Sequence, residues 1–138
     1  MWFLGHFGLG FLSAFLVSSI TGQKFQIPLI LFVSMLPDLD AFTFGLIRHR
    51  GATHSLITAA MIYLPLSTIL GLPYLAALLS HAIGDYLYPP FKMLWPLSNR
   101  WYGAPDWLRL SGRTETAVEV TLFTLMIIVI LHTQYPII

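Results

Sequence analysis

Six side chains that can bind metal ions lie within strongly apolar stretches of this sequence. They are His6, Asp38, Asp40, His54, His81 and Asp85. At the centre of a membrane helix each Asp costs roughly 2.5 to 3.5 kcal/mol, so three unpaired carboxylates would cost on the order of 7 to 10 kcal/mol. A compensating partner is therefore required, and the histidines beside these carboxylates indicate a metal ion.

The strongest local pair is His81 and Asp85. Residues four apart lie on the same face of a helix, with Cβ atoms about 5 to 6 Å apart, so an imidazole and a carboxylate can hold one cation between them. The same spacing also permits a plain His–Asp hydrogen bond inside a helix bundle. The pair alone leaves both interpretations open.

A second cluster surrounds Pro37, which is followed by Asp38 and Asp40. Proline removes a helical N–H and favours extended geometry in the preceding residue, so we expect the helix to be interrupted here. In an intact helix the two carboxylates would point about 200° apart. Either local unwinding brings both into one site, or one binds metal and the other orients a ligand histidine. The alternative is a helix end at which the carboxylates only cap the next turn.

The third cluster, residues 49–55, is typical of a turn entering a helix. Thr53 can cap the new helix, whose free N–H groups would favour an anion. Arg50 would add a forked donor for phosphate or carboxylate. A loop whose basic groups only meet lipid headgroups is the alternative, but it does not account for His49 and His54.

Composition indicates an integral membrane protein. Of 138 residues, 57% are hydrophobic and only 9% charged, and the mean hydropathy is +0.76, whereas soluble domains are about 25% charged. We therefore expect residues 1–138 to form a single transmembrane helical domain. The net charge of +1 gives no reason to expect a nucleic-acid partner. The absence of cysteine excludes thiolate metal sites and disulfides.

The apolar segments can be compared with the ~20 residues that a helix needs to cross a ~30 Å hydrocarbon core. Five can be drawn, at about 2–20, 26–47, 55–72, 74–88 and 114–134. They predict an all-α integral membrane protein, a compact bundle of about five transmembrane helices, the second interrupted near Pro37.

The distribution of basic residues predicts the orientation. If five helices alternate in direction, only Lys24 falls on one side of the membrane, and six basic residues fall on the other. Those six are Arg48, Arg50, Lys92, Arg100, Arg109 and Arg113. By the positive-inside rule the more basic side is cytoplasmic, which places the N-terminus inside and the C-terminus outside. The metal-capable side chains then all lie towards the cytoplasmic face.

Two acidic residues, Glu115 and Glu119, open the last apolar segment. Acidic groups are favoured at a helix N-terminus, and the spacing from Thr116 to Glu119 fits a capping box. A structural cap is the favoured interpretation, and the rival is that Glu115 reaches the site as a ligand or base.

The order of His6 and the motifs 36–40, 49–55, 80–85 and 94–96 resembles the LexA-regulated, YdjM-like family of inner-membrane metal-dependent hydrolases of bacteria and archaea. The resemblance covers about the first hundred residues. It implies a prokaryotic plasma (inner) membrane, a distant relationship to zinc-dependent phospholipase C and single-strand nucleases, and a ligand role for all six metal-capable residues. The chain departs from the family pattern at Ala41, where a histidine is usual, and at 87–90.

The favoured function is hydrolysis of a phosphoester, such as a phospholipid or lipid-linked phosphate, at the cytoplasmic face of the lipid bilayer. Mixed imidazole and carboxylate donors suit Zn²⁺, with Mn²⁺ or Fe²⁺ as alternatives and one or two ions. The expected catalytic residues are Asp40, as bridging ligand or general base, Arg50, on the phosphoryl oxygens, and His49. The alternatives are an ion or proton transporter that uses the buried His/Asp cluster and a non-catalytic membrane protein with a structural metal site.

Overall fold

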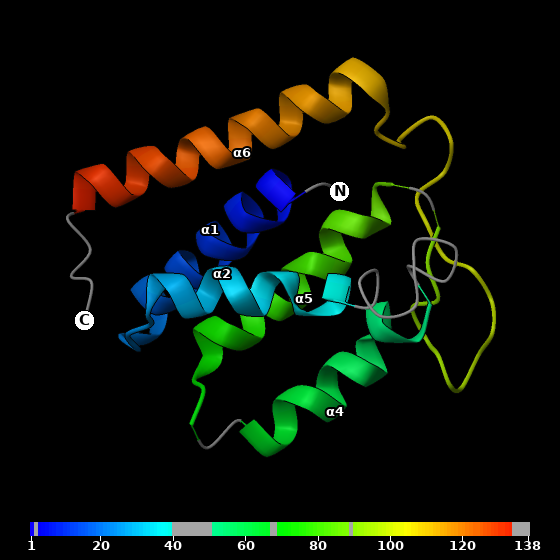
Figure 1. The fold of residues 1–138 in the computed structure, drawn as a ribbon, viewed down its shortest axis with the longest axis horizontal. Coiled ribbons are helices and arrows are strands. Elements are labelled where there is room, and N and C mark those ends of the chain that lie inside the picture. The colour runs from blue at the N-terminus through cyan, green and yellow to red at the C-terminus, as the bar shows by residue number, and fades with distance from the viewer. Residues whose placement is uncertain (2, 40–50, 67–68, 89, 134–138) are drawn as a thin grey trace.

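Five α-helices make up most of the described chain, and consecutive helices run in alternate directions (Figure 1). The computed structural model describes residues 1, 3–39, 51–66, 69–88 and 90–133. The helices are α1 (Phe3–Thr21), α2 (Ile27–Met35), α4 (Leu56–Leu66), α5 (Leu72–Tyr86) and α6 (Gly112–Thr133), with the 3-10 turns η1 (Leu36–Leu39) and η2 (Ala52–His54). No strand occurs among these residues, so the all-α prediction is confirmed.

The helices are shorter than the expected bundle of about five transmembrane spans requires. Among the described residues only α1 and α6 are long and apolar enough to cross a bilayer. At 1.5 Å per residue, the nine residues of α2 extend only about 14 Å, less than half of a ~30 Å hydrocarbon core. The remainder of the second expected segment, 40–47, lies outside the described residues. The structure therefore supports two candidate spans and leaves the other three as predictions.

The interruption near Pro37 occurs where the sequence predicts it. Helix α2 ends at Met35, and η1 continues the chain as a 3-10 turn. At the junction the N–H of Leu36 donates to the carbonyl oxygen of Val33, three residues back. The missing N–H of proline explains why a regular α-helix does not continue here. The turn redirects the chain so that Asp38 is buried.

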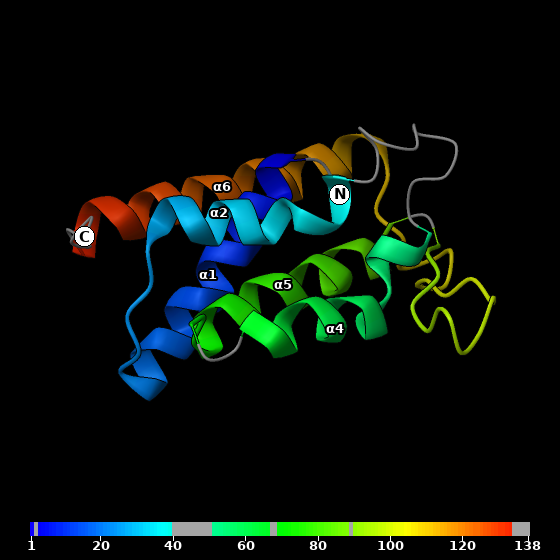
Figure 2. The same ribbon diagram turned by 60° about the horizontal axis from the view of Figure 1, so that its bottom comes forward.

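Helix α1 lies at the centre of the packing and contacts α2, α5 and α6, while α4 packs beside α5 (Figure 2). Two glycines allow the close approach of α1. A Cβ added at Gly8 would lie 2.5 Å from the backbone of Leu122 in α6, and one added at Gly10 would lie 2.5 Å from the Cβ of Ser34 in α2. Any larger residue would therefore push a neighbouring helix away.

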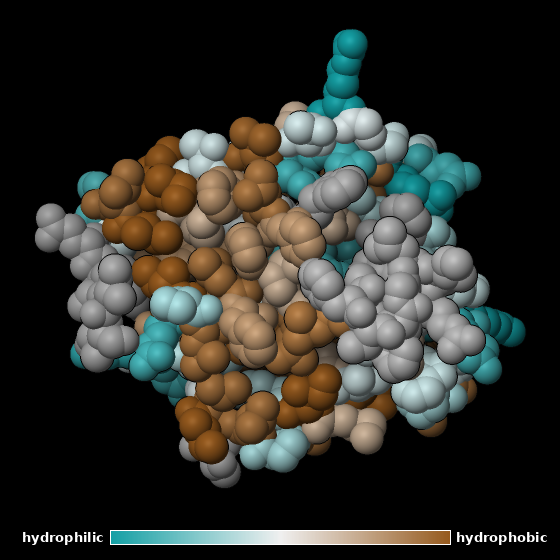
Figure 3. All heavy atoms as spheres, viewed as in Figure 1, coloured by the Kyte–Doolittle hydropathy of each residue, from teal (hydrophilic) through white to brown (hydrophobic). Residues whose placement is uncertain are grey.

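The outer surface carries many large apolar side chains, which form a broad hydrophobic area in Figure 3. Ile20, Leu64 and Leu131 are 76%, 67% and 73% exposed. Contiguous apolar surface of this kind is unfavourable in water and favourable against hydrocarbon. The arrangement is consistent with lipid around the helices.

The connection 90–111 lies at one end of the bundle and is tied to the helix ends there. At the end of α5, the carbonyl oxygen of Tyr86 accepts from the N–H of Ala104, and the carbonyl oxygen of Leu87 accepts from the N–H of Leu110. At the start of α4, the N–H of Leu56 donates to the carbonyl oxygen of Met93. This end also holds the start of α1, the turn η1, the turn η2 and the end of α5 (Figure 1). Segments distant in the sequence therefore meet at this end.

Candidate metal centre

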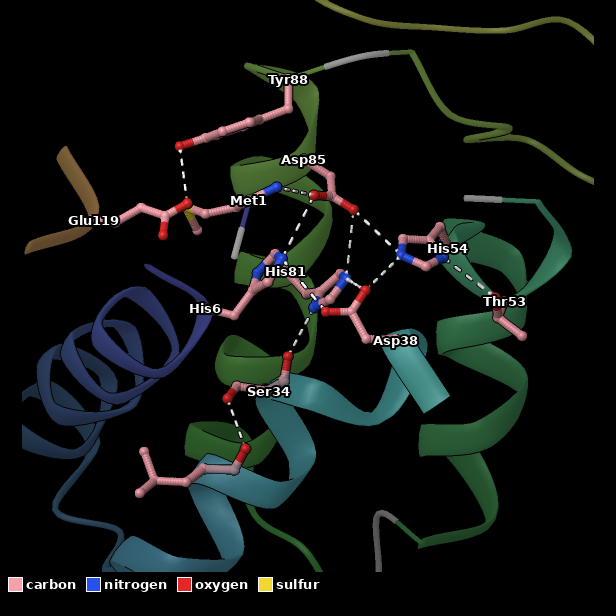
Figure 4. Close-up of polar contacts among 11 residues, drawn as sticks. Met1, His6, Ser34, Asp38, Thr53, His54, His81, Asp85, Tyr88 and Glu119 are labelled. Carbon is pink, nitrogen blue, oxygen red and sulfur yellow. Dashed lines mark hydrogen bonds and ion pairs between the residues drawn. The ribbon is translucent and has the colours of Figure 1, made fainter. Parts of the chain in front are cut away.

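Five of the six metal-capable residues converge at this end of the bundle (Figure 4). His6 comes from the first turns of α1, Asp38 from η1, His54 from η2, and His81 and Asp85 from the last turns of α5. We call these five residues the His/Asp cluster. Asp38 is 7% exposed, and each of the other four is at most 2% exposed. Burial of so many ionisable groups requires that they compensate one another or share a ligand.

The two cluster residues of α5 lie one turn apart, as the sequence spacing predicts. The Nε2 atom of His81 is 3.5 Å from Oδ2 of Asp85. On the other side of the ring, Nδ1 of His81 lies 2.7 Å from the carbonyl oxygen of Ser34. Because a carbonyl can only accept, Nδ1 must carry the proton of this hydrogen bond. Nε2 is the nitrogen turned towards the carboxylates.

Asp38 lies between histidines from three different elements. Its Oδ1 atom is 3.0 Å from Nε2 of His54 and 3.5 Å from Nε2 of His81, and its Oδ2 atom is 3.7 Å from Nε2 of His6. The 3-10 turn after Pro37 gives the carboxylate this position. The expectation that local unwinding brings both Asp38 and Asp40 into one site stays a prediction, because Asp40 lies outside the described residues.

His6 packs face to face on His81, with ring centroids 3.7 Å apart and planes within 7°. Its Nε2 atom is also 3.5 Å from Oδ1 of Asp85. This geometry turns the Nε2 atom of His6 towards the two carboxylates that also face His81. Helix α1 therefore supplies one nitrogen donor to the cluster.

His54 completes the cluster from the turn before α4. Its Nε2 atom is 3.0 Å from Asp38 and 3.3 Å from Asp85, and its Nδ1 atom is 3.2 Å from the hydroxyl of Thr53. Its ring meets that of His81 edge to face at 5.0 Å. The turn η2 therefore positions the His54 ring, with Nδ1 at Thr53 and Nε2 towards the carboxylates.

The expected anion site at the start of α4 is not supported. Ser55, rather than Thr53, caps this helix, because its hydroxyl oxygen accepts from the N–H groups of Ile57 and Thr58. The same hydroxyl donates to the carbonyl oxygen of Trp95, and the N–H of Leu56 is bound to Met93. These N–H groups therefore already have partners within the protein.

The donor set fits a divalent metal ion. Within the described part of the chain, both ring nitrogens of His6 and Nε2 of His81 are buried without a hydrogen-bond partner. His6, Asp38, His81 and Asp85 each offer one ligand atom within 4.8 Å of the others. Atoms bound to one tetrahedral Zn²⁺ at about 2.0 to 2.1 Å lie about 3.3 to 3.4 Å apart. The nitrogen–oxygen separations of 3.5 Å in the cluster are close to that value.

Three predicted residues lie outside the described part of the chain: Asp40, His49 and Arg50. The expected base, the Arg expected to bind phosphate and the additional His of the turn are therefore not placed by the structure. Their catalytic roles, and the number of ions, stay predictions.

Several contacts near the cluster were not predicted from the sequence. The amino group of Met1 donates to Oδ1 of Asp85 at 3.0 Å and is an additional positive neighbour of that carboxylate. Glu119 is 5% exposed and accepts a long hydrogen bond, 3.4 Å, from the hydroxyl of Tyr88. The predicted capping box does not form, because α6 begins at Gly112 and Thr116 lies inside the helix, where its hydroxyl donates to the carbonyl oxygen of Gly112. Glu115 instead lines a groove on α6 together with Arg113.

Comparison with known proteins identifies one family. The family model described as "YdjM inner membrane protein" matches residues 1–136, nearly the whole chain. No curated protein and no solved structure matches. The expected distant relationship to zinc-dependent phospholipase C and single-strand nucleases therefore has no support from these comparisons.

Proposed function

Because the chain belongs to the YdjM inner membrane protein family, we propose that it is a metal-dependent hydrolase that cleaves a phosphoester at the cytoplasmic face of the membrane. The observation that carries this proposal is the convergence of buried His and Asp side chains from α1, η1, η2 and α5 at one end of the bundle. Three ring nitrogens of the cluster without hydrogen bonds support a bound ion rather than a purely structural hydrogen-bond network.

The composition of the cluster favours Zn²⁺, with Mn²⁺ or Fe²⁺ as alternatives. A bound ion of this kind would supply Lewis-acid polarisation of a phosphoryl oxygen and would activate a water molecule at neutral pH. The protein contributes the fixed positions of the donors. Asp38 and Asp85 provide the negative charge that a divalent cation needs at a site with little access to water.

The remaining roles are assigned to the segment after η1 and the turn before η2. Asp40 would act as bridging ligand or general base, Arg50 would stabilise the phosphoryl oxygens, and His49 would assist in the same turn. Their closeness in sequence to Asp38 and His54 supports this assignment. Positioning and electrostatic stabilisation are the main contributions that a protein makes to phosphoryl chemistry.

The substrate class that fits best is a phospholipid or another lipid-linked phosphate. The apolar exterior supports a location within the bilayer, where such a molecule could approach in the plane of the membrane. We further propose that one domain of about five spans surrounds the site, with the N-terminus cytoplasmic and the C-terminus outside. The alternate directions of the five helices support this topology (Figure 1).

The proposal is tested by metal analysis and activity of the same preparation. The protein would be purified in detergent without added metal, and bound Zn, Mn and Fe would be measured together with hydrolysis of phosphomonoesters, phosphodiesters and phospholipids in mixed micelles. We expect bound metal in the wild type and its loss in His81→Ala and Asp85→Ala. His132→Ala is the matched control, because His132 is exposed near the other end of α6.

The outcomes separate the candidate functions. Metal without turnover of any phosphoester, and a fold that is lost on chelation, would indicate a structural metal site. Absence of metal, together with a proton or cation flux in proteoliposomes that Asp85→Asn abolishes, would indicate a transporter. The position of the cluster at one end of the bundle favours a fixed site over a relay that crosses the membrane.

A further inference from the structure

The main-chain carbonyl of Ser34 fixes the orientation of a cluster histidine. The oxygen lies 2.7 Å from Nδ1 of His81, and the contact is buried. Since Nδ1 carries the proton in this bond, Nε2 is the atom directed at the carboxylates of Asp38 and Asp85, 3.5 Å away from each. Histidines that bind metal are commonly held in one tautomer by such a second hydrogen bond.

The availability of this carbonyl follows from Pro37. Ser34 lies in the last turn of α2, where an α-helical carbonyl would pair with the N–H four residues ahead, that of Asp38. From Leu36 the chain continues as a 3-10 turn, in which a carbonyl pairs with the N–H three residues ahead; for Ser34 that residue is Pro37, which has no N–H. The N–H of Leu36 donates to Val33 instead. The turn at Pro37 therefore leaves the Ser34 oxygen available to the imidazole of His81.

Helix α1 packs closely against Ser34. A Cβ at position 10 would lie 2.5 Å from Cβ of Ser34, so the two backbones are in close contact at this point. The hydroxyl of Ser34 donates to the carbonyl oxygen of Leu31 in its own helix. The contact with His81 thus uses the main chain of Ser34 and does not use its hydroxyl.

We propose that Pro37 is a positioning residue of the metal centre: it leaves the Ser34 carbonyl to hold the Nδ1–H of His81, which directs Nε2 at the cation. The expected effect on metal affinity rests on the proposed function. The hydrogen bond between Ser34 and His81 is independent of that proposal, because its geometry requires no metal ion.

The test compares Pro37→Ala with the matched control Ser34→Ala. Alanine at position 37 restores an N–H and allows the helix to continue, so that helical N–H groups compete with His81 for the Ser34 carbonyl. Alanine at position 34 removes only the hydroxyl and keeps the carbonyl. In ¹⁵N-histidine-labelled, metal-free protein in detergent micelles, the Nδ1–H of His81 should be protected from solvent exchange in the wild type and in Ser34→Ala. It should exchange rapidly in Pro37→Ala.

Metal binding gives the second measurement, by competition between the protein and a chromophoric chelator for Zn²⁺. We expect Pro37→Ala to weaken Zn²⁺ binding by about 10- to 100-fold, the effect of losing an outer-shell partner. Ser34→Ala should change it by less than about threefold, since the carbonyl remains. Weakened binding with a still protected Nδ1–H would mean that Pro37 acts through Asp38 alone, and would overturn the inference.

A second pair of variants avoids changing the turn. Gly10→Ala should displace Ser34 and expose the Nδ1–H of His81, whereas Gly8→Ala introduces an equally close contact against Leu122 of α6, which carries no cluster residue. Protection that is equal in both glycine variants contradicts the inference, as does rapid exchange of Nδ1–H in the wild type. If the wild type shows a protected Nδ1–H but binds no metal, the proposed function fails and the assignment of the hydrogen bond stands.

Discussion

His6 and His81 lie stacked in the centre of the candidate site, with ring centroids 3.7 Å apart and planes within 7°. One ring comes from the first helix and the other from α5, so the contact joins the beginning of the chain to its second half. Each ring also turns Nε2 towards the carboxylates of Asp38 and Asp85. The stack thus combines ring packing with two nitrogen atoms that face the carboxylates.

Replacement of His6 separates these two roles. His6→Phe keeps an aromatic ring against His81 but removes the nitrogen donor, whereas His6→Ala removes both. We expect both variants to weaken Zn²⁺ binding by more than the ~10- to 100-fold that loss of an outer-shell partner costs. Thermal unfolding of the metal-free proteins should show a larger loss of stability for His6→Ala. Zn²⁺ affinity of His6→Phe equal to that of the wild type would show that this ring only packs.

Removal of metal should lower stability in a way that depends on the cluster. An ion that binds only the folded protein stabilises it by about 2.7 kcal/mol at a free concentration 100 times Kd. Chelation should therefore lower the melting temperature of the wild type in detergent. The double variant His81→Ala, Asp85→Ala should melt at the same temperature with and without chelator. If chelation left the melting temperature of the wild type unchanged, this would contradict a metal ion that bridges α1, η1, η2 and α5.

The cap of α4 should matter more for stability than the neighbouring threonine does. The hydroxyl of Ser55 accepts from two N–H groups of α4 and donates to Trp95 of the connection 90–111. We expect Ser55→Ala to lower the free energy of unfolding by about 1 to 2 kcal/mol, the usual cost of losing an N-cap. Thr53→Ala is the control and should cost less, because its hydroxyl faces Nδ1 of His54 at 3.2 Å, whereas the two N–H groups of α4 are capped by Ser55. If denaturant titrations gave equal losses of unfolding free energy for the two variants, the assignment of Ser55 as the cap would be wrong.

The absence of cysteine makes the orientation directly testable. A single cysteine at Thr21 should react with a membrane-impermeant maleimide added to intact cells, because the turn after α1 is predicted to lie outside. A cysteine at Asn99 should react only after permeabilisation, since the basic connection 90–111 is predicted to be cytoplasmic. Both positions are exposed on the protein. The reverse pattern would invert the proposed topology and move the site to the outer face.

Much of the fold follows from apolar patterning, and part of the site follows from residue spacing. Each of the five apolar segments contains a helix, and the pair His81 and Asp85 lies on one face of α5 as the i, i+4 rule requires. Pro37 marks the end of α2 because its effect is local. The extent of the spans was not predictable in this way, since hydropathy does not distinguish a helix from an apolar 3-10 turn or loop.

The contacts that sequence reasoning missed are those decided by tertiary packing. Thr53 and Ser55 both have side chains suited to an N-cap, and only the position of the connection 90–111 makes Ser55 the cap. A main-chain acceptor such as the Ser34 carbonyl leaves no trace in residue types. Glu119 has the spacing of a capping residue, yet α6 begins at Gly112, one turn before Thr116, so Glu119 lies in the second turn and is buried beside Tyr88.

The order of the cluster along the chain has a consequence for biosynthesis. Its first member is His6 and its last is Asp85, while α6 contributes none of the five residues. A nascent chain that ends before Asp85 already has an apolar first helix able to enter the bilayer, but it lacks one of the two carboxylates of the cluster. If the cluster holds an ion as proposed, its complete donor set is available only to chains synthesised and folded past α5.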